Sequence, residues 1–325
     1  MKQVQVFSPV LKLVSSLASL VVLAVGLLQA NEAWKERAKS YMTTQGGALA
    51  SADGVELGRM PDELRESSGL GISRTHPGVF WTHNDSGDRP RLYAIDSTAT
   101  LLATFEVEGA NAQDWEAMAL GLCPGRGSTS CLYLADIGDN SFERESVAIY
   151  IIEEPDPSAG DGEVPLLGTV PFVYPDGPHN AEGLAITADA DLIVITKETS
   201  RTTWLFEIPA ADVVTAVVSG EMQTLAAGHR LPITPDPDAG RLVTGATLNP
   251  DGDILAVRTY SEIYFFHWPV TDQPEQVTEA CFLGNAEPQG EAIAFQDDGR
   301  LVLTSESTTE RPGHLQVVWC PGIEP

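Results

Sequence analysis

Residues 181–209 read AEGLAITADADLIVITKETSRTTWLFEIP and contain three short apolar runs. The first run ends at Thr187, the second is LIVIT, and the third is TWLFEI. β-Branched and aromatic residues fill these runs, and acidic or small polar residues separate them, which is typical of short strands joined by tight turns. The stretch therefore predicts an antiparallel meander.

The same order of strands recurs along the chain after residue 50. Segments equivalent to the first run are SSGLGIS (67–73), WEAMALG (115–121), AEGLAIT (181–187), VTGATLN (243–249) and GEAIAFQ (290–296). A polar turn, two further apolar strands and a weaker fourth strand follow each segment. Four antiparallel strands repeated five times are typical of a five-bladed β-propeller, so we predict an all-β fold for residues 46–325. No long amphipathic helix is expected in this part of the chain.

The two ends of the repeat array predict how the ring closes. The last unit ends at Trp319 and Cys320 with no fourth strand behind it, whereas residues 55–59 form a strand-like run ahead of the first unit. An N-terminal closure strand added to the last blade would remove the exposed sheet edges. Repeats stacked as a solenoid, the alternative, would leave this run without a role.

The N-terminal region is apolar. Residues 13–30, LVSSLASLVVLAVGLLQA, carry no charge and follow Lys2 and Lys12. As a helix they would span roughly 27 Å, close to the hydrocarbon thickness of a bilayer. Helix-forming residues continue without Pro or Gly, so residues 1–45 predict a membrane anchor that runs on as a helix. A secretory signal cleaved after Ala30 is the alternative. Both place the propeller outside the cytoplasm, on the periplasmic or extracellular face.

Four cysteines agree with that location. Cys123 and Cys131 flank a Gly-rich loop, and Cys281 and Cys320 lie near the ends of strand-like runs in neighbouring units. We expect the disulfides Cys123–Cys131 and Cys281–Cys320, which suit an oxidising compartment. Zinc is the competing explanation, but no CxxC or His-x-x-x-His spacing supports it.

The composition excludes some classes of protein. The 325 residues include 46 Asp and Glu but only 19 Lys and Arg, which gives a net charge of −27. Such a surface repels phosphate backbones and argues against a nucleic-acid partner. The hydrophobic content of 43% is ordinary for a packed protein and excludes a disordered chain.

One position in each first strand carries an oxygen-bearing side chain. These residues are Ser68, Glu116, Glu182, Thr244 and Glu291. First strands line the axis of a propeller, so the five side chains should meet there. Three carboxylates at close range cannot all stay charged without a cation, and all-oxygen ligands suit Ca²⁺. The alternative is that these side chains hydrogen-bond to the backbone around the axis.

This column resembles the calcium-activated nucleotidases, the apyrases with a five-bladed propeller. Their axial Ca²⁺ is held by a Ser, Glu, Glu, Ser, Glu series, and Thr244 stands where the family has the second Ser. The resemblance covers residues 53–320 as a blade pattern and implies an axial Ca²⁺. The stretches that carry the apyrase active site have no counterpart in this chain. The units also resemble bacterial extracytoplasmic propellers of uncertain function.

Polar residues follow the second strands and are candidates for chemistry. The candidates for catalysis are Asp85, Asp136, Lys197 and Arg258. The carboxylates could bind a cation or activate water, while Lys197 and Arg258 hold an anion such as phosphate. Alternatively they are turn residues, because Asp and Asn favour tight loops.

Three functions compete at this stage. The first is a non-catalytic accessory or interaction subunit of a larger membrane complex, for example a respiratory or photosynthetic one, tethered by residues 13–30. The second is a Ca²⁺-dependent hydrolase of nucleotides or other phosphoesters. The third is a binder of small ligands or glycans that uses Trp81, Trp115 and Trp204. The uninterrupted apolar helix and the lack of a recognisable catalytic constellation favour the first.

Overall fold

The computed structural model describes residues 52–200, 202–284 and 287–323. The chain divides into two units, Met1–Ala48 and Leu49–Pro325, and the described residues all belong to the second. The predicted anchor or signal segment, residues 1–45, lies outside the described residues. Within the described ranges, no helix is both long and apolar enough to cross a bilayer.

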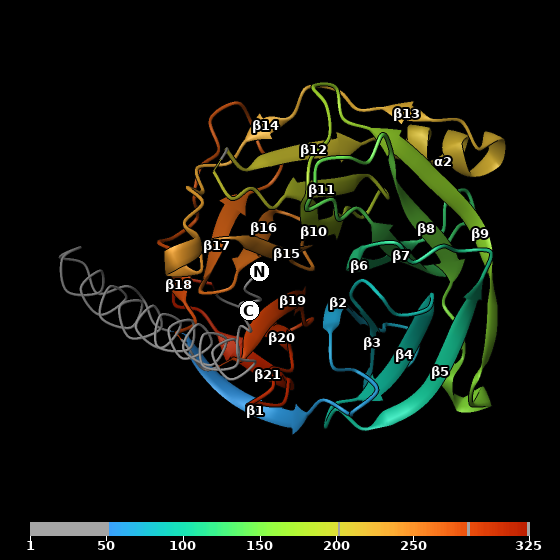
Figure 1. The fold of residues 1–325 in the computed structure, drawn as a ribbon, viewed down its shortest axis with the longest axis horizontal. Helices are drawn as coiled ribbons and strands as arrows, with labels where there is room; N and C mark the ends of the chain where they lie inside the picture. Colours follow the sequence, from blue (N-terminus) through green and yellow to red (C-terminus); the bar gives the residue numbers. More distant parts are fainter. Residues whose placement is uncertain (1–51, 201, 285–286, 324–325) are drawn as a thin grey trace, which may run out of the picture. The chain divides into compact units, whose positions relative to one another are not determined.

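The second unit has an all-β, propeller-like fold built from four-stranded antiparallel meanders, as predicted (Figure 1). The first meander contains β2 (Ser67–Ile72), β3 (Val79–Asn84), β4 (Arg91–Asp96) and β5 (Leu101–Glu108). The next contains β6 (Trp115–Leu122), β7 (Ser130–Asp136), β8 (Val147–Glu153) and β9 (Gly162–Val173). It is followed by β10 (Ala181–Ile186), β11 (Leu192–Thr196), β12 (Trp204–Ile208) and β14 (His229–Arg230). Then come β15 (Val243–Leu248), β16 (Ile254–Thr259), β17 (Glu262–His267) and β18 (Cys281–Phe282). The last sheet contains β19 (Gln289–Phe295), β20 (Leu301–Glu306), β21 (His314–Trp319) and β1 (Asp53–Arg59).

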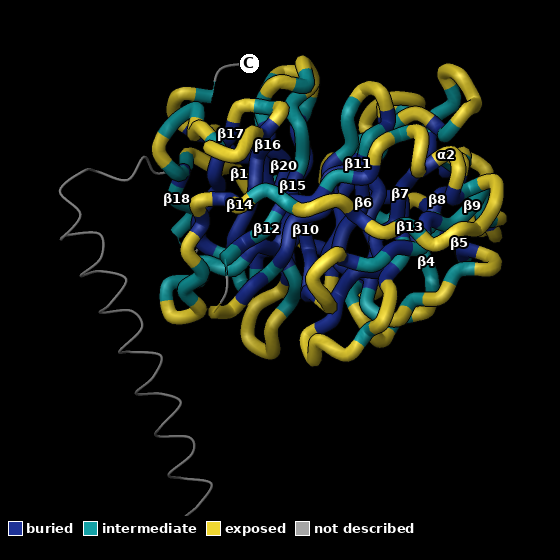
Figure 2. Tube along the Cα trace, turned by 90° about the horizontal axis from the view of Figure 1, so that it is seen from above, coloured by how far each residue is buried: buried dark blue, intermediate teal, exposed yellow. Residues whose placement is uncertain are grey.

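The first strands of these meanders surround a common axis (Figure 1). β2 packs between β6 and β19, β10 packs between β6 and β15, and β15 also contacts β19. Strands in the middle of the tube are dark blue, that is buried, in Figure 2, whereas many of the loops at its two ends are yellow, that is exposed. The core lies between neighbouring sheets, where Trp81, Tyr133 and Phe266 are each fully buried. Both faces of a sheet are covered, which explains why the second strands read as continuous apolar runs rather than alternating ones.

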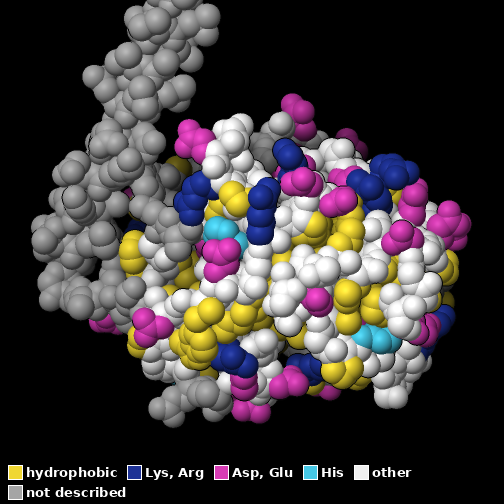
Figure 3. Space-filling model, turned by 90° about the horizontal axis from the view of Figure 1, so that it is seen from below, with side chains coloured by type: hydrophobic (Ala, Val, Ile, Leu, Met, Phe, Trp, Pro, Cys, Tyr) yellow, Lys and Arg dark blue, Asp and Glu magenta, His cyan; other side chains and the backbone are white. Residues whose placement is uncertain are grey.

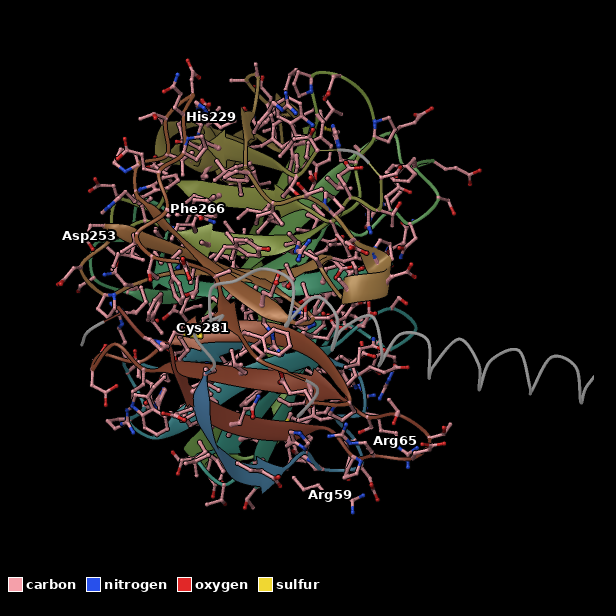
Figure 4. The ribbon with its side chains drawn as sticks, turned by 90° about the vertical axis from the view of Figure 1, so that its left-hand side faces the viewer. Arg59, Arg65, His229, Asp253, Phe266 and Cys281 are labelled. Atoms are coloured by element: carbon pink, nitrogen blue, oxygen red, sulfur yellow. A yellow bond between two sulfur atoms is a disulfide. The ribbon has the colours of Figure 1, made fainter. Side chains whose placement is uncertain are left out.

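The N-terminal strand closes the last sheet, and this prediction is confirmed. β1 pairs antiparallel with β21, so that Asp53 lies opposite Trp319 and Arg59 lies opposite His314. Arg59 marks the end of β1 in the side view of Figure 4. The pairing satisfies the backbone groups at the edge of β21.

Two sheets are joined through their outer strands. β5 runs parallel to the start of β9, and the register places Phe105 opposite Gly162 and Glu108 opposite Pro165. The first two meanders therefore form one continuous sheet. The short strand β13 (Gln223–Thr224) pairs with the other end of β9, also in parallel.

A helix that the sequence did not predict covers β9. Helix α2 (Ala210–Ser219) buries Val213 and Ala216, and Gly220 ends it in the left-handed conformation at a φ of 70°. Gly168 on β9 makes room for it, because a Cβ there would lie 2.6 Å from Val217 Cγ1. The helix is short and rich in valine, a residue typical of strands, so its sequence alone resembled another strand. Two 3-10 turns, η1 (Pro157–Ala159) and η2 (Pro237–Ala239), complete the described structure.

Both expected disulfides are present. Cys123 pairs with Cys131 across the loop between β6 and β7, and Cys281 pairs with Cys320. The second bond links β18 to the residue after β21, and so it ties two neighbouring sheets together. Figure 4 shows Cys281 on the side of the ring where this joint lies.

Candidate functional site: an axial carboxyl cluster

The five residues of the predicted axial column occupy equivalent positions. Each innermost strand shifts its register against the second strand near its start, and the column residue lies within that shift. The residues are Ser68, Glu116, Glu182, Thr244 and Glu291. A β-bulge re-aims the side chain of the extra residue, which turns these side chains away from the normal alternation. The close approach of the strands also requires a glycine after the bulge in β15, because a Cβ on Gly245 would lie 2.9 Å from the Glu291 carbonyl oxygen.

A lysine supplies the cation of this region. The Lys197 ammonium lies 2.6 Å from both carboxylate oxygens of Glu182 and donates a hydrogen bond of 2.7 Å to the Tyr260 hydroxyl. Burial disfavours the charged lysine, but the charges of Glu182 and Glu291 outweigh it and hold the pKa of Lys197 well above its usual value. Burial raises the pKa of Glu182 to about 7 although Lys197 opposes the shift.

A second part of the site is a group of three carboxyl side chains. Asp85, Asp114 and Glu116 each place one carboxylate oxygen within 4.8 Å of the others, a spacing at which one cation could contact all three. Burial, followed by the charge of Asp85, raises the pKa of Asp114 to about 6. Burial and the charge of Glu182 raise the pKa of Glu116 well above its usual range. Glu116 is only 3% exposed, so it keeps a proton where an exposed glutamate would lose it.

Glu291 and Glu306 share a hydrogen-bond donor. The Gln289 amide nitrogen lies 3.0 Å from Glu291 Oε1 and 2.7 Å from Glu306 Oε2. Burial raises the pKa of Glu306 to about 8 and raises that of Glu291 as well. We call the whole group the axial cluster. Its members are Asp85, Asp114, Glu116, Glu182, Lys197, Tyr260, Gln289, Glu291 and Glu306.

Asp136 holds the backbone next to the axial cluster in place. Its carboxylate accepts hydrogen bonds from the backbone N–H groups of Gln113 and Asp114, and Arg144 Nη1 lies 2.8 Å from it. Asp136 is 1% exposed and its charge is balanced by Arg144. The side chain predicted as a catalytic candidate therefore fixes the backbone on which Asp114 is carried.

Arg258 is a structural residue. It is completely buried, donates from Nη1 to the carbonyls of Ala292 and Thr304, and forms an ion pair with Glu287 through Nη2. These bonds anchor β16 to the β19–β20 sheet. A guanidinium engaged in this way has little capacity left to hold an incoming anion.

The predicted axial Ca²⁺ is wrong. The Lys197 ammonium occupies the position beside Glu182 that the prediction gave to the metal, and it balances part of the carboxylate charge. The Ser68 hydroxyl donates its hydrogen to the Glu116 carbonyl oxygen at 2.8 Å. Burial, together with the charge of Glu182, raises the pKa values of Glu116 and Glu291 well above the usual range, and this favours their protonated forms.

Sequence reasoning missed Asp114, Tyr260 and Gln289 in this cluster. Glu306 was noticed only as one of the polar residues at the ends of second strands and was not among the predicted site residues. Asp114 stands two residues before Glu116 and was overlooked because the repeat alignment began at Trp115. Tyr260 directly follows β16, as Lys197 directly follows β11, so a comparison of the second-strand ends could have found it.

The tryptophans proposed for ligand binding are mostly core residues. Trp81 and Trp115 are at most 1% exposed, and their indole N–H groups donate to Glu154 and to the Asn111 carbonyl. Trp204 is partly exposed and lies beside Phe206. On the outer face seen in Figure 3, acidic side chains are scattered among Lys and Arg.

Comparisons with known proteins found similarity among solved structures alone. No family model and no curated protein matches the chain. The PQQ-bound aldose sugar dehydrogenase from Streptomyces coelicolor is 11% identical, with a TM-score of 0.46 over 83% of this chain and 99% of that one. The soluble aldose sugar dehydrogenase from Escherichia coli is 11% identical, with a TM-score of 0.49 over 83% and 100%. A structure titled glucose dehydrogenase is 13% identical, with a TM-score of 0.46 over 82% and 99%. At these identities the likeness concerns the fold alone.

The prediction of a non-catalytic accessory subunit is also wrong. It depended on the absence of a catalytic constellation, whereas the structure gathers six carboxyl side chains and a lysine around the axis, several with strongly raised pKa values. The sequence did not predict this cluster because its members come from strands that are far apart in the chain.

Proposed function

We propose that the domain is an enzyme that uses the axial cluster for general acid–base catalysis. The observation that carries this proposal is the grouping of Asp85, Asp114 and Glu116, whose carboxylate oxygens lie within 4.8 Å of one another. Burial raises the pKa of Asp114 to about 6 and that of Glu116 further. A carboxylic acid that keeps its proton beside a carboxylate is the pairing that acid–base catalysis needs near neutral pH.

The charge of the site indicates the class of substrate. Acidic side chains dominate the axial cluster, and its ammonium, Lys197, already contacts Glu182. A phosphate or a carboxylate would be repelled, whereas an uncharged molecule rich in oxygen could hydrogen-bond to both acids and hydroxyls. We therefore expect the reaction to be hydrolysis of a C–O bond in a neutral small molecule, such as a lactone or an acetal.

The three carboxyl groups can divide the work. Asp85 accepts a proton from water, and the water oxygen forms the new bond to the substrate carbon. The C–O bond to the leaving group breaks, and the leaving oxygen takes the proton from Glu116. Asp114 then passes the proton from Asp85 back to Glu116. Its pKa of about 6 allows it to gain or lose a proton near neutral pH.

The quinone cofactor named for the Streptomyces structure does not fit this cluster. PQQ carries carboxylates of its own, and the cation of the axial cluster, Lys197, is already engaged by Glu182. No step of the proposed reaction passes through it.

The proposal is tested with the full-length protein and a panel of neutral lactones and aryl acetals between pH 5 and pH 8. Asp114→Asn and Glu116→Gln should each lower kcat/KM by at least about 100-fold, the usual size of a lost acid or base. Glu108→Gln, an exposed acid at the end of β5, is the matched control and should change kcat/KM by less than about twofold. No turnover of any panel member, or full activity in both variants, would contradict the proposal.

We also propose that the propeller has five blades. The support is the ring of innermost strands β2, β6, β10, β15 and β19, each followed by its own meander. An experimental structure of the second unit that placed a further sheet in the ring would contradict this number.

We propose that the domain works outside the cytoplasm, held at the membrane by residues 13–30. The two disulfides support an oxidising location, because thiols stay reduced in the cytosol. Intact mass of the protein purified from its native membranes tests the anchor. A mass that lacks residues 1–30 would favour a cleaved signal instead.

A further inference from the structure

Four polar residues of the axial cluster occupy equivalent positions at the ends of second strands. Each stands one position beyond the residue that pairs with the first strand just before its register shift. The four residues, which we call the outer layer, are Asp85, Lys197, Tyr260 and Glu306. The fifth equivalent position, after β7, holds the fully buried Ile137.

The outer layer lies nearer to solvent than the carboxyls of the axial column. All four of its residues are partly exposed, whereas the three glutamates of the column are each 3% exposed. The members of the layer also act on one another. Burial, followed by the charge of Asp85, raises the pKa of Glu306, and Lys197 opposes the shift. A molecule that enters the site from solvent therefore contacts the outer layer before it contacts the column.

The Tyr260 hydroxyl is the hydrogen-bond donor of this layer. It accepts a hydrogen bond of 2.7 Å from the Lys197 ammonium, which also lies 4.8 Å from the centre of the Tyr260 ring. Among the described residues, none accepts the hydrogen of this hydroxyl. Burial, followed by the charge of Glu291, raises the pKa of Tyr260, so the hydroxyl keeps its hydrogen near neutral pH. A hydroxyl that accepts a hydrogen bond from a cation is polarised and becomes a stronger donor.

The charge around Tyr260 distinguishes two kinds of substrate. When water attacks a lactone, negative charge develops on the carbonyl oxygen, whereas hydrolysis of an acetal develops positive charge. The Lys197 ammonium supplies positive charge beside the Tyr260 hydroxyl. Glu291, the acid that acts most strongly on the pKa of Tyr260, has a pKa raised well above its usual range by burial, which favours its uncharged form. These surroundings favour negative charge on a substrate oxygen.

We propose that Tyr260 donates a hydrogen bond to the carbonyl oxygen of the substrate, which is a lactone rather than an acetal. This inference rests on the proposed hydrolysis and identifies its substrate class. The water oxygen adds to the carbonyl carbon while its proton passes to Asp85, and the carbonyl oxygen becomes negative and accepts the hydrogen bond from Tyr260. The carbonyl then re-forms, the C–O bond to the ring oxygen breaks, and that oxygen takes the proton of Glu116. The product is a hydroxy acid.

Steady-state kinetics of the full-length protein test the proposal with the panel of neutral lactones and aryl acetals, δ-valerolactone and p-nitrophenyl tetrahydropyranyl ether among them. The wild-type protein should hydrolyse lactones and not acetals. Tyr260→Phe should lower kcat for the lactones about 100-fold to 1,000-fold and change KM by less than about threefold, because the lost donor acts mainly in the transition state. Tyr264→Phe is the matched control. It also removes a tyrosine hydroxyl, but one that donates to Glu262 outside the axial cluster, and it should leave kcat unchanged.

Two outcomes would overturn the assignment of Tyr260 and leave the proposed acid–base catalysis standing. One is turnover of acetals but not of lactones by the wild-type protein, a result that needs no variant to fold. The other is an unchanged kcat for lactones in Tyr260→Phe. Turnover of neither class of substrate would instead refute the proposed hydrolysis itself, and the assignment of Tyr260 with it.

Discussion

The Lys197 ammonium lies 2.6 Å from the Glu182 carboxylate; Glu182 is on β10, and Lys197 directly follows the neighbouring strand β11. Both are largely buried, with 13% and 4% of the side chain exposed. A buried pair of this kind does little for stability as a whole, but removal of one partner leaves the other charge uncompensated.

Lys197→Met should therefore destabilise the domain by about 3 kcal/mol, because Glu182 and Glu291 lose their cation. The free energy of unfolding in urea measures the effect. The double variant Lys197→Met with Glu182→Gln should recover much of the loss, since it removes the carboxylate that Lys197 contacts directly. A double variant no more stable than Lys197→Met would show that the lysine acts through packing instead.

The raised carboxyl pKa values make stability depend on pH. Asp114, Glu182 and Glu306 have pKa values of about 6, 7 and 8 in the folded protein, whereas unfolded carboxyls titrate near 4. The folded state binds more protons between these limits, so this contribution to stability is complete below about pH 4 and is lost as the pH rises toward 8.

The Tm of the full-length wild-type protein should therefore fall steeply between pH 5 and pH 8.5. The Tm of the double variant Glu116→Gln with Glu306→Gln should fall less steeply over the same range. The difference between the two slopes is the measured quantity, because carboxyls elsewhere titrate equally in both proteins. If the two slopes of Tm against pH were parallel, ionisation of the cluster carboxyls would not lower stability.

Gly138 leaves space for two of the acids. A Cβ at this position would lie 2.3 Å from Asp114 Oδ2 and 2.4 Å from Glu116 Oε1. Gly138→Ala should destabilise the domain by about 1–3 kcal/mol, as expected for overpacking. Gly162→Ala is the matched control, since its Cβ would meet Phe105 at an ordinary 3.7 Å, and it should change stability by less than about 1 kcal/mol. Equal effects of the two substitutions would contradict a special role for Gly138.

The two disulfides should contribute unequally. Cys281–Cys320 closes a separation of 39 residues, whereas Cys123–Cys131 closes one of 8. Each disulfide lowers the entropy of the unfolded chain. This effect predicts a contribution to stability of about 4 kcal/mol for the first bond and about 2.5 kcal/mol for the second. Urea unfolding of the paired Cys→Ala variants compares them. A larger loss for Cys123 and Cys131 would mean that the joint between β18 and β21 holds without its covalent link.

Arg258→Met should weaken the fold by several kcal/mol, because it leaves Glu287 as an uncompensated buried charge. Arg258→Met with Glu287→Gln should restore part of the stability in thermal unfolding. If Arg258→Met were as stable as the wild-type protein, the hydrogen bonds from Arg258 to the Ala292 and Thr304 carbonyls would make no net contribution to stability.

The fold was readable from the sequence because it repeats. Ser68, Glu116 and Glu182 could be aligned since each precedes the same pattern of apolar residues, and the register shifts of the structure place them at equivalent points. Helix α2 was missed because it occurs once and its valines read equally well as a strand.

The chemistry of the site was less readable, since it depends on neighbours that the sequence does not list together. Arg258 looked like an anion ligand, but the Ala292 and Thr304 carbonyls that occupy it come from a different sheet. Lys197 was recognised as a candidate, yet only its distance to Glu182 shows that it takes the place expected for a metal.

The pairing of β1 with β21 has a consequence for biogenesis. Among the described strands, β1 is the first to be synthesised, and its partner β21 is the last. During translation β1 has no partner strand, so the last sheet stays incomplete until the C-terminal residues are synthesised. A chaperone that covers the unpaired β1, or a truncation that removes β21, would therefore change the fraction of newly made molecules that fold.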